Sequence, residues 1–260
     1  MRRPAYLLLA FAVMAMISCG DKSTEPDQNA EVVAAMEHQT SVMVAQFINL
    51  TGDGFSYVDS GGPALARHAL DTLYSNFDSV TCWWTVYVEG TFIFDFTHSD
   101  SLRFLDFSQN CQQYPDTGTY FLDFRRDGTR YFERSVDSSF YAAYHLVADY
   151  VGVHRDTTAL DGNWRVEYEN EAGSDSAIFE FECDYDSILF VIYQPDNKYR
   201  PILGTLTLTL HCANSADGTD VTVTVIVSFG DSGYHGIMTL DNRTYHWNVT
   251  WQKLQDYENG

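Results

Sequence analysis

The chain has 260 residues, of which 45% are apolar and 15% aromatic, and its formal net charge is −21. This length and apolar content are enough for one large β domain or two small ones. The negative charge argues against binding to nucleic acid and against direct docking on anionic lipid headgroups, because both need basic patches.

The first residues carry the pattern of an export signal. Arg2 and Arg3 precede an apolar run, residues 7–17, which falls short of the roughly 20 apolar residues that a membrane-spanning helix needs. The run ends in Met16-Ile17-Ser18-Cys19, which resembles the cleavage box of bacterial lipoprotein signal peptides. It differs from the commonest form, which has leucine at the first position and alanine or serine at the second. The alternative is an ordinary cleaved signal in which the cysteine is incidental.

The resemblance implies that residues 1–18 are removed and that Cys19 receives a lipid anchor. Residues 19–30 are polar, contain proline and lack periodicity, so we expect a disordered tether between the lipid and the folded body. The expected location is the bacterial cell envelope, with the membrane as a partner through the anchor. By the sorting rules of such lipoproteins, Gly20 after the cysteine favours the outer membrane.

Four cysteines remain in the mature chain, and an even number in an oxidising compartment favours two disulfides. The spacing from Cys82 to Cys111 equals that from Cys183 to Cys212, and each cysteine lies in phase with the apolar side of a strand-like run. Among the possible pairings, we therefore favour Cys82–Cys111 and Cys183–Cys212. The alternative is four reduced cysteines that pack as small apolar residues.

Residues 31–76 are expected to form a helical and loop segment. Apolar residues at spacings of three, four and seven predict a helix over 31–50. The stretch Thr51-Gly52-Asp53-Gly54 is expected to end this helix. A second short helix is expected over 64–74.

From residue 77 to 255 the apolar period switches to two, which predicts a mainly β domain with an antiparallel sheet. The Asp127-Gly128 pair lies between two such runs and predicts a hairpin turn. The strands should form a barrel, a sandwich or a strongly curved sheet, and the shared cysteine spacing hints at two similar halves, about 77–160 and 161–255. Strands are expected at 79–88, 91–97, 102–108, 119–126, 129–135, 139–150, 163–169, 177–183, 187–193, 203–211, 220–229, 234–240 and 243–251.

No motif for catalysis, metal or cofactor emerges from the chain. Gly230-Asp231-Ser232-Gly233 matches the stretch around the serine of trypsin-like proteases, but the histidine motif of that family is absent and the string is ordinary hairpin chemistry. His235 and His246 lie on strands that should pair, which would bring them close together. Neither a metal site nor a cofactor is predicted.

The predicted function is that of a non-catalytic envelope lipoprotein whose β body binds a ligand or has a structural role. The ligand would be apolar, held in a concave sheet, or a carbohydrate stacked on exposed tryptophans. The alternative is a secreted glycan hydrolase that acts through two carboxylates. The candidate binding residues are Trp83, Trp84, Trp164, Trp247 and Trp251, although packing in the core would also account for them.

Overall fold

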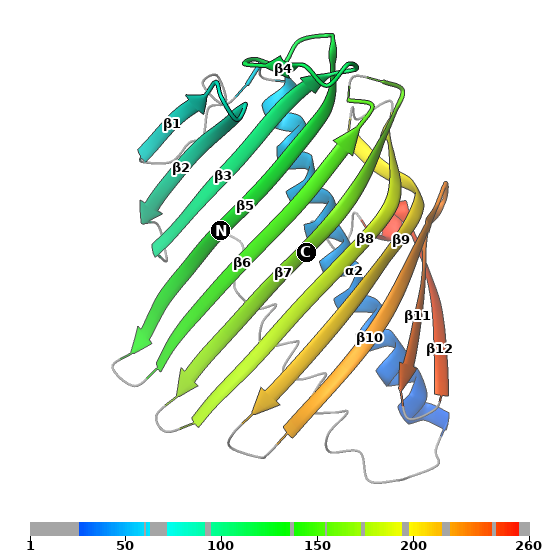
Figure 1. Cartoon of the computed structure of the whole chain (residues 1–260). Coiled ribbons are helices and arrows are strands. Elements are labelled where there is room, and N and C mark those ends of the chain that lie inside the picture. Colours follow the sequence, from blue (N-terminus) through cyan, green and yellow to red (C-terminus); the bar gives the residue numbers. More distant parts are fainter. Residues whose placement is uncertain are drawn as a thin grey trace.

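The computed structural model describes residues 26–59, 61–62, 72–91, 95–135, 138–153, 155–172, 175–193, 198–214, 219–240 and 243–254 (Figure 1). The predicted signal peptide and Cys19 lie outside these residues. The described chain forms one long helix, α2 (Pro26–Asp59), and twelve strands. The strands are β1 (Thr72–Asp78), β2 (Trp83–Thr91), β3 (Asp95–Asp106), β4 (Cys111–Gln112), β5 (Thr119–Ser135), β6 (Ser138–Val151), β7 (Thr157–Ala172), β8 (Asp175–Tyr193), β9 (Lys198–Asn214), β10 (Thr219–Gly230), β11 (Gly233–Leu240) and β12 (Arg243–Thr250).

All twelve strands belong to one antiparallel sheet. Eleven of them follow each other in chain order from β1 to β12, and the short β4 pairs with β3 beside this path. The sheet is not closed, so β1 and β12 form its two edges. The mainly β prediction is therefore confirmed, and of the three expected arrangements the chain adopts an open sheet, which bends around α2 (Figure 1).

Helix α2 crosses one face of the sheet diagonally, from the late strands to the early ones (Figure 1). In the first half of the helix, Ser41 Oγ shares a hydrogen bond of 2.7 Å with the hydroxyl of Tyr234 on β11. Near its end, Tyr57 Oη donates to Asp100 Oδ2 on β3, also at 2.7 Å. No helix among the described residues is long and apolar enough to cross a membrane.

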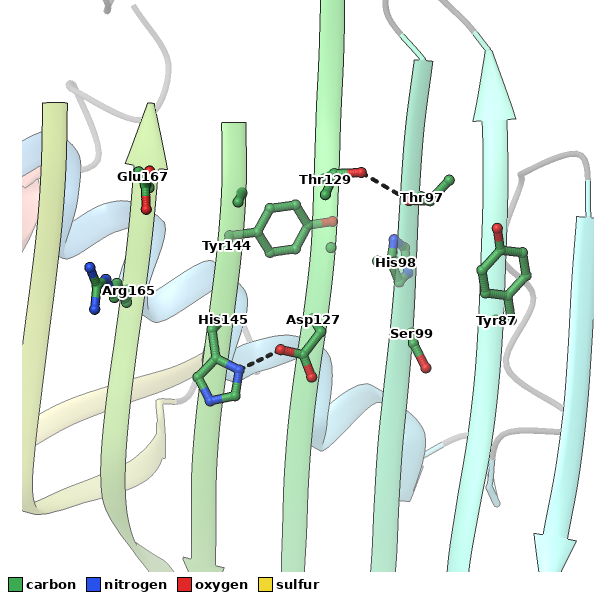
Figure 2. A pocket seen from close by; sticks show the side chains of 12 residues that line it. Tyr87, Thr97, His98, Ser99, Asp127, Thr129, Tyr144, His145, Arg165 and Glu167 are labelled. Atoms are coloured by element: carbon green, nitrogen blue, oxygen red, sulfur yellow. Dashed lines mark hydrogen bonds and ion pairs between the residues drawn. The ribbon is translucent and has the colours of Figure 1, made fainter. Parts of the chain in front are cut away.

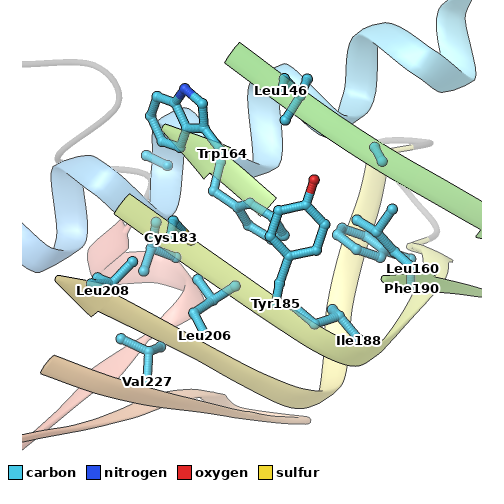
Figure 3. Close-up of a cluster of buried hydrophobic side chains, with 14 of the residues drawn as sticks. Leu146, Leu160, Trp164, Cys183, Tyr185, Ile188, Phe190, Leu206, Leu208 and Val227 are labelled. Atoms are coloured by element: carbon cyan, nitrogen blue, oxygen red, sulfur yellow. The ribbon is translucent and has the colours of Figure 1, made fainter. Parts of the chain in front are cut away.

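The sheet has an inner face, which is covered by α2, and an outer face on the opposite side. On β10, Val223, Val225 and Val227 are buried on the inner face, whereas Thr222 and Thr224 alternate with them and are exposed. This period of two is the pattern of an antiparallel sheet with one wet face. The hydrophobic core lies between the inner face and α2, and one part of it is shown in Figure 3.

The helix was expected to end at Thr51-Gly52-Asp53-Gly54, and this prediction is wrong because α2 continues to Asp59. Tertiary packing explains the difference. Tyr150 on β6 donates a hydrogen bond of 2.7 Å to the carbonyl oxygen of Thr51. Its ring lies so close to Gly54 that a Cβ there would be 2.5 Å from the tyrosine oxygen. Gly54 therefore permits close helix–sheet approach, which outweighs the modest cost of glycine in a helix.

The expected hairpin turn at Asp127-Gly128 is also wrong, since β5 runs through both residues without interruption. Gly128 lies beside Tyr144 of β6, and a Cβ at this position would be 2.3 Å from the end of the tyrosine ring. This glycine therefore makes room for a neighbouring aromatic ring inside a strand. By contrast, Gly230-Asp231-Ser232-Gly233 does form the turn between β10 and β11, as predicted.

The N-terminal boundaries also differ from those expected. Helix α2 begins at Pro26, so residues 26–30 are helical and not part of a tether. Strand β1 begins at Thr72, within the segment expected to be helix and loop; most of the second helix expected there lies outside the described residues. The suggested division at residue 160 falls inside β7, which is paired on both sides, so the sheet is continuous there.

One of the two favoured disulfides is confirmed. Cys82 and Cys111 are bonded, with their Cα atoms 5.8 Å apart, and they link the β1–β2 turn to β4. The Cys183–Cys212 pairing is wrong, because Cys183 is free and buried. Strand register sets Cys183 opposite Leu208 and Cys212 opposite Phe179, a separation of roughly 13 Å along the strands, whereas a disulfide needs Cα atoms within about 7 Å.

Candidate functional site

A hollow of about 440 Å³ lies on the outer face over strands β2, β3, β5, β6 and β7 (Figure 2). Most of its side chains belong to the outward-facing set of these strands. They combine an aromatic ring, hydroxyls, carboxylates, an imidazole and a guanidinium group. The lining residues are Tyr87, Thr97, His98, Ser99, Asp127, Gly128, Thr129, Ala143, Tyr144, His145, Arg165 and Glu167.

Strand register sets the polar groups of the hollow in a single row. Tyr87 faces Ser99 across β2 and β3, Ser99 faces Asp127, Asp127 faces His145, and His145 faces Arg165. Direct cross-strand neighbours have Cβ atoms about 4.5–5.5 Å apart, so their polar ends can meet the same small ligand. The row exists because each of these positions has the outward phase of its strand.

The imidazole of His145 is held by Asp127. His145 Nδ1 and Asp127 Oδ1 are 2.5 Å apart (Figure 2). Asp127 lies between Ser99 and His145 in the row, whereas a serine nucleophile needs the histidine in the middle position. The row therefore lacks the order of a catalytic triad and presents hydrogen-bonding groups at fixed spacing.

A second polar chain extends from Arg165 towards β10. Arg165 Nη2 lies 3.4 Å from Glu180 Oε1, and Glu180 Oε2 lies 3.4 Å from His211 Nδ1. His211 Nε2 is 2.9 Å from Asp220 Oδ1. The hydrogen bond to Asp220 is the main cause that raises the pKa of His211 above its ordinary value of 6.5, and the bond to Glu180 adds to it, whereas partial burial acts in the opposite direction.

The raised pKa of His211 gives a prediction for pH dependence. Because the folded pKa lies above 6.5, protonated His211 stabilises the folded state below that pH, and this contribution disappears as the pH rises through the folded value. We expect Asp220→Asn to lower the pKa of His211 towards 6.5, measured by NMR titration of the imidazole. The control is Asp231→Asn, which changes an exposed acid in the β10–β11 turn and should leave the pKa of His211 unchanged. An equal shift in both variants would contradict the pairing of His211 with Asp220.

Beneath the hollow, on the inner face, lies a buried ion pair. Arg126 donates two hydrogen bonds to Asp100, from Nε to Oδ1 and from Nη2 to Oδ2, each at 2.7 Å. Asp100 is fully buried and also accepts the hydroxyl of Tyr57 from α2. These bonds tie the two strands that carry Ser99 and Asp127 to each other and to the helix.

The predicted tryptophan surface is not present. Trp84, Trp164 and Trp247 are buried on the inner face, where the indole ring of Trp84 donates to the Gln113 carbonyl oxygen at 2.5 Å. Their large apolar rings lie in the inward phase and fill the core, so the prediction that they bind ligand is wrong. Trp83 is half-buried beneath Arg103, whose Cζ is 5.0 Å from the ring, and Trp251 is half-buried and donates to the Asp231 carbonyl oxygen.

The two histidines expected to be neighbours do lie together on the outer face. His235 Nε2 and His246 Nδ1 are 3.4 Å apart, and the rings stack with centroids 5.4 Å apart. Within the described part of the chain, no group of three or more histidines, cysteines and acids is placed to hold a metal ion.

No protein family, curated protein or solved structure was found to match this chain. Sequence reasoning missed the main residues of the hollow, Tyr87, Asp127, His145 and Arg165, because Asp127-Gly128 was assigned to a turn. Had residues 119–135 been taken as one strand, the period of two would have placed Asp127 on the outward face.

Proposed function

We propose that the protein is a non-catalytic, lipid-anchored protein of the bacterial cell envelope that binds a hydroxyl-rich ligand, such as a carbohydrate, on its outer face. The observation that carries this proposal is the composition of the hollow. Tyr87 offers a 37% exposed ring for stacking, while Asp127, His145 and Arg165 offer both donors and acceptors of hydrogen bonds. An aromatic platform beside such polar groups suits a ligand with apolar faces and a polar edge.

The apolar-ligand alternative has less support. On the inner face, α2 occupies the place that an apolar ligand would take. Phe47 packs against Tyr185 with ring centroids 5.0 Å apart, and Phe55 stacks on Tyr199 at 3.6 Å. The hollow on the outer face is instead open to solvent, and Asp127, His145 and Arg165 in its lining can form hydrogen bonds with a hydrophilic ligand.

The glycan-hydrolase alternative has no specific support either. The two carboxylates of the hollow, Asp127 and Glu167, lie on strands separated by β6 and in different cross-strand rows, so they are not direct neighbours. Glycoside hydrolysis needs two carboxyl groups at about 5–5.5 or 6.5–9.5 Å. Asp127 is also engaged by His145.

The binding test uses isothermal titration of residues 20–260, the chain without the proposed signal peptide and lipidated cysteine, with a panel of glycan fragments. We expect Tyr87→Ala to weaken binding about tenfold, because a stacking aromatic contributes roughly 1 kcal/mol or more. Tyr74→Ala is the matched control, since Tyr74 is the direct cross-strand neighbour of Tyr87 and is 61% exposed but does not line the hollow.

Two results would contradict the proposal. Equal weakening by Tyr74→Ala and Tyr87→Ala would show that binding does not take place in the hollow. Release of reducing ends from the same glycans, lost on Asp127→Asn or Glu167→Gln, would replace the non-catalytic function by hydrolysis.

A further inference from the structure

An apolar row crosses the outer face near the end of the sheet that carries β4. Phe107, in the turn after β3, extends this row and is 71% exposed; its ring centroid lies 5.0 Å from that of Tyr120, which neighbours Phe121. The six remaining residues of the row lie side by side, one on each of six strands that are neighbours in the sheet. We call these seven residues the apolar belt: Leu105, Phe107, Phe121, Val151, Ala159, Leu189 and Leu203.

The belt differs from the rest of the outer face. Leu203 is 56% exposed, and the other strand members are half-buried at the surface and point away from the core. The neighbouring row is charged: it includes Arg103, which forms an ion pair with Asp123, followed by Asp149 and Asp161. A contiguous apolar patch rimmed by polar residues marks an interaction surface.

A stripe of carboxylates leads into this belt along β8. Glu180, Glu182, Asp184 and Asp186 occupy successive outward positions, and the strand then reaches Leu189 of the belt. Glu180 interacts with Arg165 and His211, whereas Glu182 and Asp184 form no ion pair with any described residue. We call these four residues the acidic stripe. Arg165 and His211 offset part of its charge at Glu180, and the stripe carries the remaining negative charge to the apolar belt.

We propose that the apolar belt and the acidic stripe together form a docking surface for a protein segment in which basic residues adjoin an apolar end. The basic residues would pair with Glu182 and Asp184, and the apolar end would cover Leu189 and Leu203. This surface adjoins the ligand hollow, because Glu180 of the acidic stripe pairs with Arg165 of the hollow, but neither the belt nor Glu182 and Asp184 line the hollow. The docking proposal does not depend on the function proposed for the hollow.

Three observations favour such a partner over a lipid surface or a second copy. Helix α2 begins at the lower right of Figure 1, and the belt lies at the opposite end of the sheet, near β4, so the belt is remote from the side where the described chain begins. The carboxylates beside the belt would also repel anionic headgroups. Two copies of a chain with a net charge of −21 would repel each other in the same way.

The test measures binding of a synthetic peptide with a lysine-rich half and a leucine-rich half to residues 20–260 by fluorescence anisotropy. We expect Leu203→Ser and the double variant Glu182→Gln/Asp184→Asn each to raise the Kd about tenfold. Two controls are matched in exposure and chemistry: Ile226→Ser, an outward residue on β10 that is 41% exposed, and Asp231→Asn in the β10–β11 turn. Both should leave the Kd unchanged.

Further arms separate the other occupants. A peptide with glutamate in place of lysine should bind at least about tenfold more weakly, and salt should weaken binding of the lysine peptide. No binding of the lysine peptide, or equal effects of belt and control variants, would overturn the proposal. Self-association in sedimentation that Leu203→Ser abolishes would overturn the proposal in favour of a second copy. Binding to vesicles of anionic or zwitterionic lipid that Leu203→Ser abolishes would overturn it in favour of a lipid surface.

Discussion

Replacing Arg126 with methionine should lower the free energy of unfolding by about 3–5 kcal/mol. Asp100 has no exposed surface, and Arg126 supplies two of its hydrogen bonds. Removing the guanidinium would leave the carboxylate buried without the cation that compensates its desolvation. The loss should also loosen α2, because Asp100 accepts the hydroxyl of Tyr57 from that helix.

Urea unfolding followed by circular dichroism measures this effect, and the chain offers a matched control. Arg125 is the next residue on β5 but points outward, and its ion pair with Asp149 is partly exposed. We expect Arg125→Met to cost less than about 1 kcal/mol. In the double variant Arg126→Met/Asp100→Leu, much of the stability should return, because no buried charge remains. Equal losses of stability in Arg125→Met and Arg126→Met would contradict the inference that the buried ion pair stabilises the fold.

A second large effect is expected at Phe47, in the middle of α2. Phe47→Ala should destabilise the protein by about 3–5 kcal/mol, since truncating a buried phenylalanine loses its transfer free energy and leaves a cavity. Phe47 is 1% exposed, and its ring lies 5.0 Å from Tyr185, 6.2 Å from Phe190 and 6.4 Å from Phe229. It therefore joins the helix to strands β8 and β10.

The control is Phe107→Ala, which removes the same side chain from a site that is 71% exposed. This substitution should change stability by no more than about 0.5 kcal/mol. Comparable losses for the two variants, measured in the same urea titration, would show that α2 is not part of the cooperative core.

The alternation of apolar and polar residues was sufficient to predict the later strands. On β10 to β12 the period of two is uninterrupted, and the predicted limits agree with the observed ones to within a residue or two. The predictions were less accurate where glycine lies inside an element. Gly54 and Gly128 each accommodate a tyrosine ring from a neighbouring strand, and nothing local distinguishes such a glycine from one in a turn.

These errors are the reason why the sequence did not predict the candidate site. Because Asp127 was placed in a turn, its neighbours Ser99 and His145 could not be set in one row. The tryptophans were proposed for binding on composition alone, and the direction in which a ring points is decided by strand phase and by packing. Trp84 and Trp164 have the inward phase, so they are buried.

The sequence by itself determined the mainly β class and the exposed and buried phases of the later strands, because these follow from periodicity along the chain. Spacing favoured two disulfides equally, and only the fold decided that Cys82 and Cys111 are bonded whereas Cys183 is free. The tertiary structure alone decided that the sheet stays open and that α2 covers its inner face. It also decided which outward residues meet in the hollow and in the apolar belt. Those outcomes rest on strand register and on contacts between residues far apart in the chain, such as Tyr57 with Asp100 and Tyr150 with Thr51.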